Sequence, residues 1–145
     1  MKLGLFLFEK ERHWNWYCSR VPTAWAEDMG GFIVIDTDTG TPVAAILMSE
    51  WTASTCILSI IIEKPIALRH GLLEVAADFV FNKENRLKAL IRVSSKNMRS
   101  LNFCKNAGFT EICKIKDGFD LLDDMVFLEI HREDCKYLNS VEEVA

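Results

Sequence analysis

The residues whose types and spacing point to chemistry lie in one segment, from Asn97 to Phe109. Asn97 can cap a helix, because its side-chain oxygen can accept a hydrogen bond from a backbone N–H that the first helical turn leaves unpaired. Gly108 can end that helix in a left-handed conformation, which glycine adopts at little cost. Apolar runs flank the segment on both sides. It therefore predicts a strand, a capped helix and a second strand in succession.

This order of elements resembles the acyl-CoA-binding C-terminal half of the GNAT acetyltransferases. In that family the asparagine is followed by a small residue three positions on, then by a short helix and Gly-Phe. Asn97, Ser100, Gly108 and Phe109 fit that spacing. The likeness covers most of the chain and is specific from about Cys56 to Ile130. It implies that the chain is an N-acetyltransferase, which moves an acetyl group from acetyl-CoA to a primary amine by direct attack in a ternary complex.

The resemblance also implies where the acyl-CoA is held. The slot opens where two strands splay apart, here Cys56–Glu63 and Leu87–Val93, and Asn97 contacts the CoA arm with Ser100 beside it. The alternative role for Asn97 is that of a helix cap, and both roles can hold at once. The full set of cofactor-binding residues that we expect is Ile61, Ile62, Leu68, Arg69, His70, Gly71, Leu72, Asn97, Ser100 and Phe103.

The family binds the CoA pyrophosphate on a loop before a helix, where consecutive backbone N–H groups form an anion site. The corresponding segment, Pro65–Leu73, has an arginine and one glycine but lacks the family's paired glycines. The resemblance implies that Leu68–Leu72 cradles a phosphate, with Arg69 or His70 supplying positive charge. The alternative is that Gly71 lets a helix pack closely while both side chains face solvent.

Acetyl transfer needs a base for the attacking amine and an acid for the leaving thiolate. The base candidate is Glu63, at the end of the central strand, with Glu50 second. In many family members the acid is a tyrosine seven residues after the asparagine, and here that position is Cys104. A thiol has a reference pKa of about 8.5 but is a weak donor. The alternatives are solvated strand-end charges for the glutamates and a small buried residue for Cys104.

Length and composition bound these expectations. The 145 residues predict a single domain, 1–145, that is long enough to bury a sizeable core. Hydrophobic residues make up 50% and charged residues 26%, which excludes a disordered chain. The net charge of −4 disfavours nucleic acid as a main partner, because phosphate binding requires an excess of Lys and Arg. Nucleic-acid binding would need a basic face that the composition does not indicate.

Cysteine and histidine usage argues against a disulfide framework and against a metal site. The five cysteines are odd in number and form no CxxC pair, and the three histidines are scattered.

No apolar run reaches the roughly 20 residues that a membrane span requires. Charged residues follow the short N-terminal apolar run at once, so we interpret that run as a strand and expect a cytoplasmic protein.

Hydrophobic periodicity predicts an α/β fold with a GNAT-like mixed, mostly antiparallel central sheet flanked by helices. The expected strands are 3–8, 31–36, 42–51, 56–63, 87–93, 109–116 and 125–131. The expected helices are 9–20, 67–82 and 97–107, with a further helical turn at 24–29. Strand 56–63 is nearly all apolar and should be covered on both faces. Turns are expected at 38–41 and 117–118, and the tail 133–145 should form a short helix or fray.

Acceptor choice is expected to depend on the N-terminal helices and on the loops near Trp51 and Phe119. Several aromatic residues crowd the N-terminal region, and they either wall a substrate pocket or pack into the core, with at least one exposed. These residues are His13, Trp14, Trp16, Tyr17 and Trp25.

Two further possibilities stay open. The chain is alternatively a catalytically inactive GNAT-fold binding or structural accessory protein, of the kind that phages carry, as the degenerate phosphate loop and Cys104 suggest. Strand 125–131 is a candidate edge strand that pairs across a homodimer.

Overall fold

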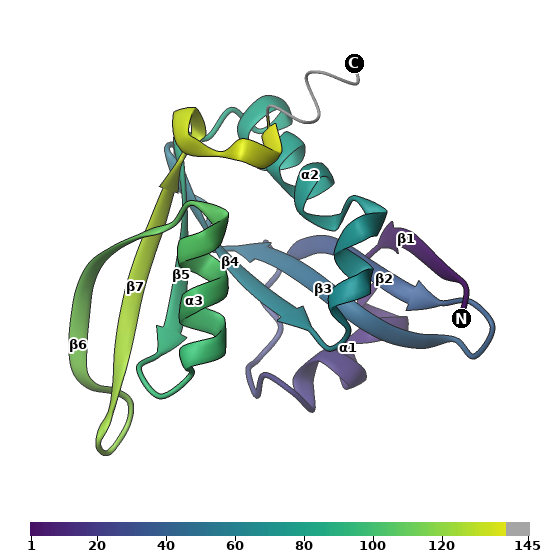
Figure 1. Ribbon diagram of the computed structural model, residues 1–145, viewed down its shortest axis with the longest axis horizontal. Coiled ribbons are helices and arrows are strands. Elements are labelled where there is room, and N and C mark those ends of the chain that lie inside the picture. The colour runs from purple at the N-terminus through teal and green to yellow at the C-terminus, as the bar shows by residue number, and fades with distance from the viewer. Residues whose placement is uncertain (139–145) are drawn as a thin grey trace.

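The computed structural model describes residues 1–138 and contains one seven-stranded sheet in the order β1-β2-β3-β4-β5-β7-β6 (Figure 1). The strands are β1 (Leu3–Leu7), β2 (Gly30–Asp36), β3 (Thr41–Ser49), β4 (Thr55–Ile62), β5 (Lys88–Ser94), β6 (Thr110–Asp120) and β7 (Asp123–His131). The α-helices are α1 (Lys10–Cys18), α2 (Leu72–Ala77) and α3 (Met98–Ala107). The predicted α/β architecture is confirmed.

One strand pair differs from all the others. β4 and β5 run parallel, whereas every other neighbouring pair is antiparallel. Their pairing begins at Thr55 with Lys88 and stops at Leu58 with Ile91, although both strands continue. Residues 59–62 of β4 and 92–94 of β5 therefore have no ladder pairing with each other. The predicted splayed pair is present, and it opens the sheet at its middle strand.

Helices cover the two faces of the sheet unequally. α2 and α3 pack on one face over the larger core, which includes Leu58 and Ile91. α1 packs on the other face, where Tyr17, Ile33 and Leu47 form a smaller cluster. Because side chains alternate along a strand, Ile60 and Ile62 join the larger core and Ile61 joins the smaller one. Ile60, Ile61 and Ile62 are only half-buried, so β4 is less completely covered than predicted.

The helix predicted over 67–82 is three short helical segments. A 3-10 helix, η1 (Pro65–His70), is followed by α2 and then by a π-helical turn, η2 (Asp78–Lys83). Gly71 separates the first two with a φ of +82°, in the left-handed region. A Cβ atom on Gly71 would meet no heavy atom within 4 Å. The glycine is therefore required by its backbone angle and not by close packing.

Three other predictions are wrong. The helical turn expected at 24–29 is only a turn at 27–28, where the Met29 N–H donates to the Ala26 carbonyl at 3.0 Å before β2 begins at Gly30. The turn expected at 117–118 is not the end of β6. Asp117 has a φ of 55° and lies within a register shift between β6 and β7, and the chain reverses at Leu121 and Leu122. β7 lies between β5 and β6, so it is not an edge strand and cannot pair across a dimer by its edge.

The chain that follows β7 forms two short helical segments. The chain turns through a 3-10 helix, η3 (Arg132–Asp134), and is helical again at 136–138, while the rest of the predicted tail helix lies outside the described residues. Among residues 1–138, no helix has the length and apolar character needed to cross a bilayer.

Candidate active site

The splay opens a groove of about 600 Å³ between β4 and α3. A volume of this order is typical of small-molecule sites. The groove is lined by Ile60, Ile62, Pro65, Leu68, Ile91, Asn97, Arg99, Ser100, Asn102, Phe103, Cys104 and Asn106. It is called the donor groove below.

The sequence of α3 explains how the helix presents its polar edge. The Asn97 side-chain oxygen accepts a hydrogen bond from the Ser100 backbone N–H at 3.1 Å, which confirms the predicted cap. Gly108 ends the helix with a φ of +110°. Leu101, Cys104 and Ala107 turn one side of the helix into the core. The adjoining side is left to line the groove.

The two walls of the donor groove differ in chemistry. The strand wall is apolar and consists of Ile60, Ile62 and Ile91. The helix wall is polar, and its one charged side chain is that of Arg99. An elongated ligand with both amide groups and methylene groups suits such a groove, because each finds a matching wall.

A second space lies at the splay and shares Ile60, Ile91, Asn97 and Ser100 with the donor groove. Its volume is about 380 Å³, and a third space of about 230 Å³ adjoins it through Ser59, Arg92 and Phe119. The two are together called the acceptor cavity below. Because the same residues border both, the donor groove and the acceptor cavity meet at the gap between β4 and β5.

The acceptor cavity contains a hydroxyl pair that sequence reasoning missed. Tyr17 is 1% exposed, and its hydroxyl donates a hydrogen bond to the Oγ of Ser59. Burial raises the pKa of Tyr17, while the bond to Ser59 opposes that rise. Ser59 is the only polar residue between Cys56 and Ile62, and this interruption of an apolar strand was the available signal.

Two arginines line the acceptor cavity, and each is paired with a glutamate. Arg92 donates to Glu50 at 2.7 Å, and Arg20 donates to Glu63. The guanidinium of Arg20 also lies 4.7 Å from the centroid of the Trp16 ring. Both arginines border the cavity, but no carboxylate is among the described residues that line it.

The two predicted catalytic residues lie in different environments. Glu63 follows the last residue of β4, is held by Arg20, and is not among the side chains that line the donor groove or the acceptor cavity. Cys104 lines the donor groove but is otherwise fully buried, and this burial raises its pKa to about 11. The second base candidate, Glu50, is tied to Arg92 at the surface.

The predicted cofactor-binding residues divide into two groups. Those that line the donor groove are Ile62, Leu68, Asn97, Ser100 and Phe103. Those that do not are Ile61, Arg69, His70, Gly71 and Leu72. Leu72 is fully buried in the core and does not border the groove.

The groove also contains residues that were not predicted. Arg99, Asn102 and Asn106 recur at spacings of three and four, which places them on one helical face near Asn97. That spacing was visible in the sequence and could have identified them.

The N-terminal aromatic residues are mostly structural. Trp14 stacks on Tyr17 and meets Trp25 edge to face, and both tryptophans are half-buried. His13 is buried, which lowers its pKa, and it accepts a hydrogen bond from the Glu9 N–H at 2.9 Å. Trp16 is also half-buried, so the expected exposed aromatic residue is not found among them. Tyr17 is the member of this group that reaches the acceptor cavity.

The part of the chain that the structure describes contains no candidate metal site. No group of three His, Cys, Asp or Glu side chains there could hold an ion, and all five cysteines are free.

Comparison with solved structures defines the fold. The spermidine/spermine N-acetyltransferase SpeG from Vibrio cholerae, in complex with manganese ions, superposes with a TM-score of 0.74 at 17% identity, covering 96% of each chain. A SpeG mutant form from the same organism gives 0.74 at 18% identity, covering 95% of this chain and 97% of that one. No protein-family model matches the chain, and no curated protein matches it by sequence. The chain has the GNAT fold.

Proposed function

We propose that this chain is an N-acetyltransferase that uses acetyl-CoA as its acyl donor and a primary amine as its acceptor. The observation that carries the proposal is the meeting of the donor groove and the acceptor cavity at Ile60, Ile91, Asn97 and Ser100. Direct transfer requires both substrates to be bound at once with their reacting atoms in contact. Two spaces that border the same four residues suit such a ternary complex.

The residues of the donor groove fit the CoA arm. Pantetheine carries amides along an otherwise aliphatic chain, which suits a groove with a polar helix wall and an apolar strand wall. Asn97, Asn102 and Asn106 offer side-chain amides, and Arg99 supplies the positive charge that a phosphate needs. Arg69 and His70 are exposed on η1, so they are available to a phosphate that extends beyond the groove.

Acetyl-CoA supplies the acyl group as a thioester, and the amine nitrogen forms a bond to the carbonyl carbon as the carbon–sulfur bond breaks. The amine must lose a proton and the thiolate must gain one. Cys104 keeps its proton at neutral pH, because burial raises its pKa to about 11, and it lines the donor groove. It is the acid candidate. Glu63 is the base candidate, and since it lies outside both spaces it would act through water.

The lining of the acceptor cavity bears on the choice of amine. SpeG acts on spermidine and spermine, and binding such a polycation favours carboxylates around the site. Here the charged side chains that line the cavity are those of Arg20 and Arg92. We infer an acceptor with less positive charge than a polyamine, surrounded by apolar groups such as Val21 and Phe119.

A second candidate is a GNAT-fold binding module without transfer activity. The observation that favours it is the ion pair between Arg20 and Glu63, which engages the predicted base, while none of the described residues that line the cavity is a carboxylate. A binding module would retain affinity for CoA but catalyse no transfer to any amine.

The test is a calorimetric titration with acetyl-CoA of the wild type, Asn97→Ala and Asn97→Ser. Serine caps a helix about as well as asparagine, whereas the loss of the cap in the alanine variant costs about 1 kcal/mol of stability. We expect saturable wild-type binding and weaker binding by both variants, because both lack the amide in the groove. Thermal unfolding of the serine variant should stay close to that of the wild type.

The outcomes separate the candidates. No binding of acetyl-CoA to the wild type contradicts both. Binding without turnover over a panel of primary amines contradicts the enzyme and supports the binding module. If only the alanine variant binds more weakly, Asn97 acts through the helix cap alone.

A further inference from the structure

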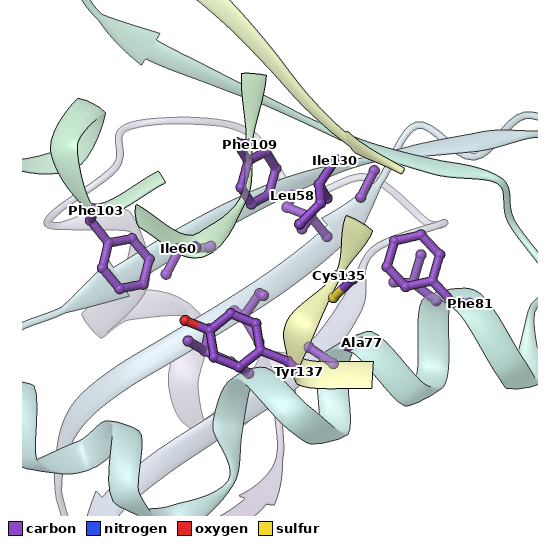
Figure 2. A pocket seen from close by; sticks show the side chains of 15 residues that line it. Leu58, Ile60, Ala77, Phe81, Phe103, Phe109, Ile130, Cys135 and Tyr137 are labelled. Carbon is purple, nitrogen blue, oxygen red and sulfur yellow. The ribbon is translucent and has the colours of Figure 1, made fainter. Parts of the chain in front are cut away.

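A small apolar cavity adjoins the donor groove under α3 (Figure 2). Its volume is about 40 Å³. Fifteen residues line it, and Figure 2 labels Leu58, Ile60, Ala77, Phe81, Phe103, Phe109, Ile130, Cys135 and Tyr137 among them. None of the described residues that line it carries a charge.

The position of this cavity is defined by the residues that it shares. Ile60 and Phe103 line both the cavity and the donor groove. Ile60 also lines the acceptor cavity. All three spaces therefore border Ile60, and a thioester in the groove must lie beside this residue if an amine in the acceptor cavity is to reach it.

The size of the cavity suits a short hydrocarbon chain. One water-sized sphere needs about 10–15 Å³ by the same measure of volume, so 40 Å³ holds about three. A methylene group is of similar size. A cavity with an apolar lining does not hold water well, because water finds no hydrogen-bonding partners there.

The backbone accounts for the space. Ala77 ends α2, and Val80 and Phe81 belong to the π-helical turn η2. A π-helical turn is wider than an α-helical turn and is frequent at functional sites. The small side chains of Ala76, Ala77 and Ala107 leave the volume open, while Phe81 closes it.

We propose that this cavity receives the hydrocarbon tail of the acyl group, so that the chain binds a short acyl-CoA such as butyryl-CoA in preference to acetyl-CoA. The inference rests on the proposed function, because it needs an acyl-CoA in the donor groove. It keeps the proposed transfer from an acyl-CoA to an amine, but it makes a four-carbon acyl thioester, and not acetyl-CoA, the preferred donor.

The test is calorimetric titration with acetyl-, butyryl- and octanoyl-CoA, which needs no knowledge of the acceptor. Butyryl-CoA has two more methylene groups than acetyl-CoA, and burying each contributes about fourfold in affinity. We expect butyryl-CoA to bind about fifteenfold more tightly than acetyl-CoA. Octanoyl-CoA should bind no better than butyryl-CoA, since the cavity holds only about three carbon atoms.

Two variants locate the effect. Ala77→Val fills the cavity and should remove the preference for butyryl-CoA while leaving acetyl-CoA binding within about twofold. The matched control is Ala45→Val, which adds the same bulk to a buried position in the smaller core on the opposite face. Phe81→Leu removes three side-chain carbon atoms from the lining and should shift the preference toward hexanoyl-CoA, added to the titration, which keeps the test open if Ala77→Val does not fold.

The outcomes are distinct. Equal or weaker binding of butyryl-CoA, relative to acetyl-CoA, overturns this inference and leaves the proposed function intact. A preference for butyryl-CoA that survives unchanged in both Ala77→Val and Phe81→Leu also overturns it, because the tail then lies elsewhere. If no acyl-CoA binds at all, the proposed function fails together with the inference.

Discussion

The two sides of the splayed strands are built from different kinds of structure. The donor groove lies between β4 and α3, which are regular elements with defined caps and periodicity. The acceptor cavity is closed by residues 20–23 after α1 and by Phe119 near the tip of the β6–β7 hairpin. The groove that we propose for the acyl donor is therefore built from regular elements, whereas the segments that close the cavity proposed for the acceptor follow no repeating pattern.

Blocking the residues that the donor groove and the acceptor cavity share should have the largest effect, which should be a loss of affinity for the acyl donor. Ser100 lines both spaces, and Ser100→Trp places an indole where the donor must pass. Displacing the indole should cost a bound ligand about as much as overpacking costs a core, about 1–3 kcal/mol, so we expect a loss of about 5- to 150-fold in affinity for acetyl-CoA. Calorimetric titration measures it.

The control for that variant is Ser54→Trp, which adds the same bulk at an exposed turn. It should bind acetyl-CoA as the wild type does. Unchanged affinity in Ser100→Trp would mean that the donor does not pass between α3 and β4, and the distinction between the two sides would then fail.

The same contrast explains what could be predicted from the sequence. The caps of α3 follow from Asn97 and Gly108, because capping depends on residues within one turn of the helix end. The splay followed only from the resemblance to the GNAT family. The break at Gly71 had a local signal in the glycine itself, which the prediction of one long helix overlooked.

The acceptor cavity could not be predicted in this way. Its polar contacts join residues far apart in the sequence, as in Tyr17 with Ser59 and Arg92 with Glu50, each 42 residues apart. Such contacts depend on the register of several strands and on the way in which α1 crosses them. No local pattern encodes either of those, so side chains with ordinary local roles become neighbours only in the folded chain.

A second prediction tests whether the hydroxyl pair of the acceptor cavity is also structural. Ser59→Ala leaves the buried Tyr17 hydroxyl without its hydrogen-bond partner. An unpaired buried polar group costs about 1–3 kcal/mol, so we expect the free energy of unfolding to fall by that amount. Urea denaturation followed by circular dichroism measures it.

The double variant Tyr17→Phe/Ser59→Ala provides the control. It removes both partners, so part of the lost stability should return, and acetyl-CoA affinity should change in neither variant because both residues lie outside the donor groove. A double variant that is less stable than Ser59→Ala alone would contradict the coupling of the two hydroxyls. A loss of acetyl-CoA affinity would place the pair on the donor side.

The smallest effect on stability should come from the ion pair between Arg92 and Glu50, and this makes Arg92 a good probe of acceptor binding. The side chains of the pair are 38% and 53% exposed, and exposed ion pairs contribute about 0–1 kcal/mol. Arg92→Gln should therefore leave the free energy of unfolding within about 1 kcal/mol of wild type and leave acetyl-CoA affinity unchanged. Any change in the KM for the amine then arises at the acceptor cavity, where Arg92 lies, and not from loss of fold.

The control is Lys88→Gln, which removes a cation from the same strand, β5. Lys88 pairs with Glu129, whose side chain is only 23% exposed. The Lys88→Gln variant should destabilise the protein at least as much as Arg92→Gln and leave the KM for the amine unchanged. A larger loss of stability in Arg92→Gln than in Lys88→Gln would make Arg92 a structural residue, and the two sides of the splay would no longer differ in the way that their elements indicate.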